Sequence, residues 1–247
     1  MKIEQVSDSV HMVSGTNVNW ALVSDGSGVT VIDAGYPADT AAVLDSVRRI
    51  GHTVGDIAAV LLTHAHLDHI GAIPTLVEQA NVVVYTGELE VPHAKREFLQ
   101  QITAPQMLRQ LTTRRGTRWV MQTARAVIGH IDMRVPTAQA ADPTALAALP
   151  GGFVAISTPG HTDGHTAYFM PSEGVLFSGD ALVTGHPLLP GTGPQLLPKV
   201  FNHDQTRTQV GVQALAIEQA HVLVPGHGPA IHQHLPTLIA ELPYLRE

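Results

Sequence analysis

The stretch Thr63-His64-Ala65-His66-Leu67-Asp68-His69 decides how the rest of this chain is interpreted. It places three imidazoles and one carboxylate within six residues, directly after residues 57–62, a short apolar run that predicts a buried strand. Imidazole and carboxylate are ligands that Zn²⁺ and similar ions accept in proteins. Burying these groups together without an ion would be costly. We therefore expect a metal-binding loop at the end of a strand.

Three further donors follow in the second half of the chain. His161 stands in a Pro-Gly-His turn, Asp180 follows Gly179, and His227 stands in another Pro-Gly-His turn. A glycine precedes each donor, which allows the backbone to come close to an ion. These residues are the candidates that could complete the ligand set begun by residues 64–69.

The order of predicted elements is similar in the two halves of the chain. In the first half we expect strands at 10–13, 20–23, 29–32, 57–62 and 82–85, a hairpin turn at 25–28, and helices at 39–50 and 71–80. In the second half we expect strands at 166–170, 175–180 and 220–224, with a turn at 171–174. A diverged internal duplication of this kind would bring ligand-bearing loops from both halves to one place.

Residues 92–137 differ in character and predict a basic helical insert. They hold eight Lys or Arg side chains against two acids, and apolar residues recur at helical spacing at Val120, Ala124, Val127, Ile128 and Ile131. Three functions are open for this segment: recognition of an anionic substrate, a lid over the site, or a contact through which the chain forms a homodimer rather than a monomer. Amphipathic helices with solvated arginines are the simplest interpretation.

Length and composition exclude several classes of protein. The 247 residues fit a single domain, and the net charge of −7 makes nucleic acid an unexpected partner. The absence of cysteine excludes a disulfide framework and a thiolate nucleophile. The first residues have no apolar segment typical of a signal peptide, and no run is long and apolar enough to span a membrane, so we expect a cytoplasmic protein with a small-molecule substrate.

The motifs from Trp20 to Gly228 resemble those of the metallo-β-lactamase superfamily. The resemblance rests on His-x-His-x-Asp-His, a Pro-Gly-His turn, a Gly-Asp pair and a late Gly-His, in that order. It implies an α/β fold, an αββα sandwich of two facing mixed β-sheets flanked by helices, with a cleft for two metal ions at one edge. It also implies a ligand set in which one ion is bound by His64, His66 and His161, the other by Asp68, His69 and His227, and Asp180 bridges both.

Other polar residues are given supporting or ordinary roles. His165, four residues after His161, is expected to be structural or to orient a ligand rather than to bind an ion. Asp33 resembles a supporting residue of the family that could hold a ligating imidazole in one tautomer. Five further histidines are expected to be ordinary loop or surface residues: His186, His203, His221, His232 and His234. Of these, His186 and His203 could line a substrate cleft.

Two divalent ions that share a carboxylate predict a hydrolase whose nucleophile is a metal-bridging hydroxide. Asp68 would orient the nucleophile or pass a proton to the leaving group. Zn²⁺ is the expected ion, with Fe or Mn²⁺ as alternatives. The resemblance favours a lactonase or glyoxalase-II-like enzyme that cleaves a carboxylic ester, lactone or thioester, and not a true β-lactamase. Two alternatives stay open: a phosphodiesterase for a nucleotide-like anion, and a non-catalytic metal-binding sensor or scaffold.

Overall fold

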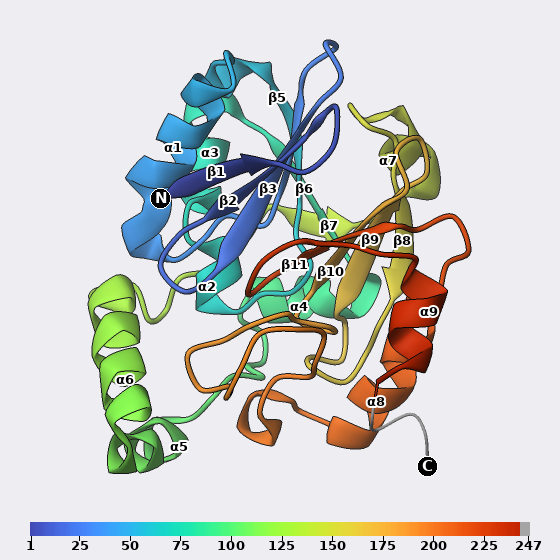
Figure 1. Cartoon of the computed structure of the whole chain (residues 1–247). Coiled ribbons are helices and arrows are strands. Elements are labelled where there is room, and N and C mark those ends of the chain that lie inside the picture. The colour runs from blue at the N-terminus through green and yellow to red at the C-terminus, as the bar shows by residue number, and fades with distance from the viewer. Residues whose placement is uncertain (243–247) are drawn as a thin grey trace.

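The computed structural model describes residues 1–242, which form two β-sheets packed face to face (Figure 1). The first sheet has the order β1-β2-β3-β4-β5-β6-β7. Its strands are β1 (Lys2–Gln5), β2 (Val10–Ser14), β3 (Asn19–Ser24), β4 (Val29–Ile32), β5 (Ile57–Leu61), β6 (Val83–Thr86) and β7 (Ala138–Ala140). The sheet is mixed, because β1 to β4 pair antiparallel and β4 to β7 pair parallel.

The second sheet has the order β12-β11-β10-β9-β8. Its strands are β8 (Val154–Ser157), β9 (Thr166–Met170), β10 (Val175–Gly179), β11 (Val222–Pro225) and β12 (Ile231–His232). Within it β9 and β10 pair antiparallel and β10 and β11 pair parallel. The strands β3, β4 and β5 of the first sheet are paired in the same way. This shared order matches β4 with β10 and β5 with β11, so the loops that follow these strands take matching positions in the two halves.

Three apolar layers hold the sandwich together. The central layer lies between the sheets, where Ala21 and Leu61 of the first sheet share a cluster with Tyr168 and Phe177 of the second. Helices α1 (Thr40–Arg49) and α3 (Ile73–Ala80) cover the outer face of the first sheet. Helices α8 (Gln205–Gln213) and α9 (Leu235–Ala240) cover the outer face of the second. The αββα sandwich expected from the sequence is therefore confirmed.

The remaining helices and turns complete the described chain. They are α2 (Leu67–Ile70), α4 (Val91–Ala94), α5 (Ala104–Arg109), α6 (Arg114–Val127) and α7 (Pro143–Ala148), with 3₁₀ turns η1 (Pro37–Asp39), η2 (Val54–Asp56), η3 (Glu88–Glu90), η4 (Gln110–Thr112) and η5 (Lys199–Phe201). Within residues 1–242, none of the helices has the length and apolar character needed to cross a membrane.

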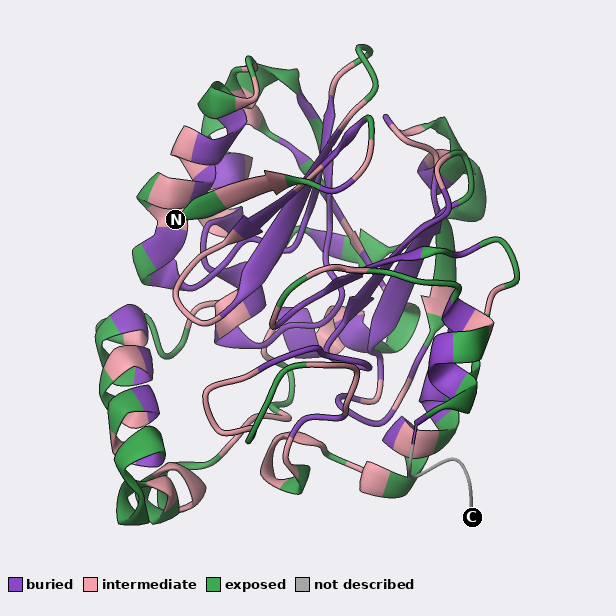
Figure 2. Ribbon diagram, in the orientation of Figure 1, coloured by how far each residue is buried: buried purple, intermediate pink, exposed green. Residues whose placement is uncertain are grey.

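The basic segment is helical, but its apolar stripe differs from the one expected. Helix α6 ends at Val127, because Ile128 leaves the helical conformation with a ψ of 127° and Gly129 takes a positive φ of 78°. Ile128 is consequently 78% exposed instead of lying on a helical stripe. The buried side of α6 is formed by Gly116, Trp119, Thr123 and Ala126, and the outer side is exposed (Figure 2). The orientation of this helix therefore depends on a few single residues that pack against the rest of the protein, and not on a continuous aliphatic face.

Candidate metal centre

The ligand candidates gather at one edge of the sandwich, where strands of both sheets end. Residues 64–69 follow β5, His161 lies between β8 and β9, Asp180 follows β10 and His227 follows β11. The two sheets are joined at this edge, since Thr166 N donates to Thr63 O at 3.0 Å. Loops that are about 100 residues apart in sequence are thereby held side by side, as the repeated strand order requires.

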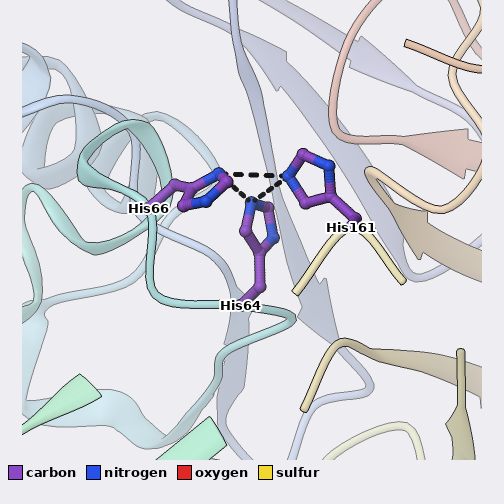
Figure 3. Close-up of side chains that lie close together, drawn as sticks. All are labelled: His64, His66 and His161. Atoms are coloured by element: carbon purple, nitrogen blue, oxygen red, sulfur yellow. Dashed lines mark hydrogen bonds between the residues drawn. The ribbon is translucent and has the colours of Figure 1, made fainter. Parts of the chain in front are cut away.

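Three imidazoles form what we call the tri-histidine cluster: His64, His66 and His161. Their facing atoms are His64 Nε2, His66 Nδ1 and His161 Nε2, which lie 3.0–3.1 Å from one another (Figure 3). Ligand atoms bound tetrahedrally to Zn²⁺ at ordinary bond lengths are about 3.3 Å apart. The three nitrogens could therefore bind one ion with little movement.

A second group, the carboxylate cluster, consists of Asp68, His69 and His227. His227 Nε2 is 3.6 Å from Asp68 Oδ2, and His69 Nε2 is 3.9 Å from the same oxygen. One ligand atom from each of the three residues lies within 4.8 Å of the others, so that this group could also hold an ion. It is looser than the tri-histidine cluster and contributes a negative charge that the first cluster lacks.

Asp180 lies between the two clusters. Its Oδ2 is 3.1 Å from His227 Nε2 and 3.5 Å from His161 Nε2, and its Oδ1 is 3.5 Å from His69 Nε2. Asp180 Oδ1 and His69 Nε2 are both buried without a hydrogen-bond partner among the described residues. Buried polar atoms without a partner are rare and costly, and an ion between these atoms would satisfy both. The donor set therefore fits metal ions.

Each of the five histidines has its second ring nitrogen within hydrogen-bonding distance of a protein oxygen. In the tri-histidine cluster, His64 Nδ1 lies 3.0 Å from Thr63 Oγ1, His66 Nε2 lies 2.6 Å from Gln100 O, and His161 Nδ1 lies 2.9 Å from Asn202 Oδ1. In the carboxylate cluster, His69 Nδ1 lies 2.8 Å from Asp33 Oδ2, and His227 Nδ1 lies 2.6 Å from Asn17 O. When the outer nitrogen donates its proton in this way, the inner nitrogen keeps a free lone pair. All five rings can thus present acceptors to the same centre.

The backbone conformation at Asp33 and Gly226 allows polar groups around the site to pack closely together. Asp33 has a φ of 57°, which is unusual for a residue other than glycine. In this conformation its carboxylate accepts hydrogen bonds from Thr63 N and Thr63 Oγ1 as well as from His69 Nδ1, each at 2.8 Å. Gly226 packs against Asp180, and a Cβ atom at position 226 would collide with Asp180 Oδ1. Asp33 therefore has the supporting position that the sequence suggested.

The two clusters differ in how their surroundings affect protonation. Burial lowers the pKa of His64 and His66 well below the usual value and also lowers the pKa of His161. Burial also opposes charge on His69, but the carboxylates of Asp33, Asp180 and Asp68 outweigh it and raise the pKa of His69 to about 10. The tri-histidine cluster is therefore neutral without an ion, whereas the carboxylate cluster attracts a proton.

His165 is buried beside the centre but does not join it. Its Nε2 accepts a hydrogen bond from Asp180 N at 3.0 Å, and its Nδ1 lies 2.7 Å from Thr158 Oγ1. Burial and the neighbouring His161 lower its pKa to about 3. With both nitrogens engaged and no positive charge, His165 orients the backbone of Asp180. This arrangement agrees with the supporting role preferred from the sequence.

A pocket of about 230 Å³ opens onto both clusters. Its polar lining includes Tyr36, Asp68, Asp180 and His227. Much of the remaining lining is apolar: Ile102, Met107, Trp119, Val127 and Ile131 come from the insert, and Leu67, Leu197 and Phe201 from the rest of the chain. His186 lines the pocket and lies against Trp119 and Phe201, whereas His203 does not line it. Among residues 1–242, no Lys or Arg side chain lines it, so the basic side chains of the insert do not face the pocket.

Several residues at the site had no signal in the sequence. Tyr36 is 5% exposed and lines the pocket, and burial together with Asp68 raises the pKa of its phenol well above the usual value. Gln100 and Asn202 contact the candidate ligands His66 and His161 from loops far away in sequence. Each is a single polar residue outside any recognisable motif, and only the fold brings it to the centre.

Comparison with known proteins places the fold and the ligand motifs in one family. The model of the metallo-β-lactamase superfamily matches residues 13–227, so the chain belongs to this superfamily. Among solved structures, a metallo-β-lactamase family protein of Thermus thermophilus has a TM-score of 0.64 at 20% identity, covering 96% of this chain and 80% of that one. This likeness shows the shared fold.

Two curated relatives are named as hydrolases. The probable metallo-hydrolase YflN of Bacillus subtilis (strain 168) is 25% identical over 213 residues, which cover 84% of this chain and 78% of that protein. A hydroxyacylglutathione hydrolase of Xanthomonas campestris pv. campestris (strain B100) is 30% identical over 183 residues, 73% of this chain. The match covers only 52% of the Xanthomonas enzyme's own length. Together with the family, these names identify a metal-dependent hydrolase.

Proposed function

We propose that this chain is a binuclear metal hydrolase that cleaves an uncharged carboxylic ester, lactone or thioester. One divalent ion is bound by the tri-histidine cluster, the other by the carboxylate cluster, and Asp180 bridges them. The observation that carries the proposal is the convergence of five inner nitrogens, each with its outer nitrogen on a protein oxygen. Zn²⁺ suits these imidazole and carboxylate donors, and Fe or Mn²⁺ would fit the same set.

When bound, two such ions lower the pKa of water and polarise the carbonyl oxygen of the substrate. The protein's own groups would do the remaining work. Asp68 lines the pocket, where its carboxylate would orient the attacking water and pass a proton to the leaving group. The buried, protonated Tyr36 hydroxyl would donate a hydrogen bond to a substrate oxygen. We expect Tyr36→Phe to reduce kcat about tenfold, most for substrates with poor leaving groups.

The pocket wall supports a neutral, apolar substrate. Trp119, His186 and Phe201 form a ring cluster with centroid distances of 5.1–5.9 Å. Burial, with a contribution from His227, lowers the pKa of His186 to about 3, so that this ring is uncharged at neutral pH. The name of the Xanthomonas relative supports a thioester as the bond that is cleaved, whereas glutathione itself is charged, so the name does not support the apolar character of the substrate. A nucleotide-like anion is disfavoured, since the part of the chain that the structure describes places no Lys or Arg side chain in the wall.

The test is a panel of aryl and alkyl esters, lactones, thioesters and a bis-aryl phosphodiester, with kcat/KM measured for zinc-loaded protein. We expect hydrolysis of carbonyl substrates that is lost with a chelator and restored by Zn²⁺. Cleavage of the phosphodiester alone would favour the phosphodiesterase alternative. A protein that holds two ions but hydrolyses no substrate of the panel would favour the non-catalytic alternative.

The role of the pocket wall can be tested separately. Trp119→Ala should raise KM about tenfold for esters with a bulky apolar acyl group and change it little for an acetate ester. Arg118→Ala is the matched control, because Arg118 is the preceding residue of α6 and lines a groove on the outer side of that helix. An equal effect of both variants would contradict the assignment of the wall.

A further inference from the structure

Glu90 is a fully buried carboxylate at the end of η3, and it lies outside both metal clusters. Its Oε1 accepts a hydrogen bond from Ala65 N at 2.7 Å and lies 2.6 Å from His93 Nδ1. Its Oε2 accepts a hydrogen bond from Thr162 Oγ1 at 2.7 Å. Burying a carboxylate is costly, and this one is stabilised by three partners drawn from three separate segments.

The positions of two of these partners relate Glu90 to the tri-histidine cluster. Ala65 lies between His64 and His66, and Thr162 directly follows His161. One carboxylate therefore connects the two loops that carry all three imidazoles, although 97 residues separate His64 from His161. The hydrogen bonds of Glu90 reach no residue of the carboxylate cluster.

The neighbours of Glu90 also hold the loop of residues 64–69 in place. Arg96 donates from Nη1 to Ala65 O at 2.8 Å, so that both polar atoms of the Ala65 backbone are held. Gly164 packs directly on the backbone of Glu90, where any Cβ atom would collide with it. A second link between the loops passes through Gln100, whose carbonyl accepts from His66 and whose side-chain oxygen accepts from Asp163 N at 2.9 Å.

We propose that Glu90 is a positioning residue that holds the tri-histidine cluster in its binding geometry before an ion arrives. This inference rests on the proposed function, because it assumes that the cluster binds a metal. Without the hydrogen bonds of Glu90, the links through Gln100 and Thr166 remain, but the ion would have to supply more of the ordering of the two loops, and this cost would reduce affinity. Loss of Glu90 therefore lowers the affinity of the tri-histidine cluster for its ion, whereas the affinity of the carboxylate cluster for its ion does not change.

The experiment measures Zn²⁺ affinity by competition with a chromogenic chelator. Each variant is made in the full wild-type chain and in a His227→Ala chain. The His227→Ala substitution disrupts the carboxylate cluster and leaves the tri-histidine cluster intact. We expect Glu90→Ala to raise the Kd of the first ion about 10–100-fold, the range typical of outer partners of metal ligands. Glu90→Gln should have a smaller effect, because its amide oxygen can still accept from Ala65 N. The absorption spectrum of the Co²⁺-loaded cluster should change in the same order.

Glu173→Ala is the matched control. Glu173 also connects the two halves of the chain, since it accepts hydrogen bonds from Ser9 N at 3.2 Å and Ser9 Oγ at 2.6 Å. It lies in the turn before β10, and Asp180 follows that strand, so Glu173 is at the end of the sandwich away from the metal clusters. We expect this variant to lose stability without any change in the Kd of either ion.

Two results would overturn the inference. One is an unchanged Kd of the first ion in Glu90→Ala. The other is a loss of affinity for both ions that merely follows thermal stability, as in the control. If Glu90→Ala does not fold, Thr162→Val decides, because it removes only the hydrogen bond to one loop. A wild-type chain that binds no divalent ion overturns both proposals, whereas one that binds ions without hydrolysis overturns only the proposed function.

Discussion

The tri-histidine cluster and the carboxylate cluster lie side by side, but they differ in the spacing of their polar atoms and in the effect of their surroundings on protonation. Burial keeps the imidazoles of the first cluster neutral, with nitrogens already 3.0–3.1 Å apart. In the second cluster, carboxylates raise the pKa of His69 to about 10, and the contacts are longer. The first cluster is therefore arranged by packing and the second by charge, and each should respond to a different kind of change.

The largest effect is expected where the two clusters meet. Asp180 contacts ligand atoms of both, so Asp180→Ala should weaken both ions and lower kcat by more than about 100-fold, beyond the 10–100-fold typical of outer partners. Metal content and kcat measured on the same preparation test this. Two ions per chain with full activity in this variant would show that Asp180 does not bridge.

Single ligand changes should separate the clusters. His161→Ala should remove the ion of the tri-histidine cluster and His227→Ala that of the carboxylate cluster, each leaving one ion per chain with a large loss of kcat. Metal analysis after gel filtration measures the stoichiometry. If either variant loses both ions, the clusters are not independent and the comparison between them fails.

A change behind the second cluster should have an intermediate effect. Asp33→Asn keeps the shape of the side chain but removes the charge that faces His69 Nδ1. We expect the Kd of the second ion to rise about 10–100-fold, with the first ion unchanged. This variant mirrors Glu90→Ala. Equal losses at both sites would mean that Asp33 acts through the fold and not through His69.

The last expected effect concerns stability rather than metal binding, and it is the pH dependence of the metal-free protein. Burial lowers the pKa of His186 to about 3, so its neutral form stabilises the fold above pH 6.5, and this stability is lost as the pH falls toward 3. His69, with its pKa raised to about 10, contributes stability below pH 6.5 that is lost as the pH rises through 10. The free energy of unfolding should therefore be greatest near pH 6.5.

Urea denaturation of chelator-treated protein at several pH values measures both limbs. Each group contributes a slope of at most about 1.4 kcal/mol per pH unit. His186→Phe should make the acid limb less steep and leave the alkaline limb in place, because His64, His66, His161 and His165 also contribute to the acid limb, and His186 lies against the carboxylate cluster without belonging to it. A stability profile that rises steadily from pH 6.5 to pH 10 would contradict the raised pKa of His69.

The ligand candidates were predictable because they follow strands in short motifs, and the fold brings all seven to one edge. The supporting residues were not predictable in this way. Glu90 stands in an acidic stretch, Glu88-Leu89-Glu90, that is typical of a solvated turn, yet it is fully buried. The stripe expected in the insert was also wrong at Ile128, because helical spacing in sequence continues past the point where Gly129 ends the helix.

The insert illustrates a second limit of composition. Its arginines suggested an anionic ligand, but Arg114, Arg118 and Arg125 line a groove on the outer side of α6, away from the centre. The side that faces the pocket carries Trp119 and Thr123. Charge counted along a segment does not show which face of a helix carries it.

The distance in sequence between the candidate ligands has a consequence for how the protein denatures. An ion shared by His64 and His161 would act as a cross-link that closes a loop of 97 residues between the two sheets. Cross-links of this length restrict the unfolded chain, and any ion that binds only the native state stabilises it further as its concentration rises. The melting temperature should therefore depend on free Zn²⁺, and a chelator would both stop turnover and loosen the contact between the halves.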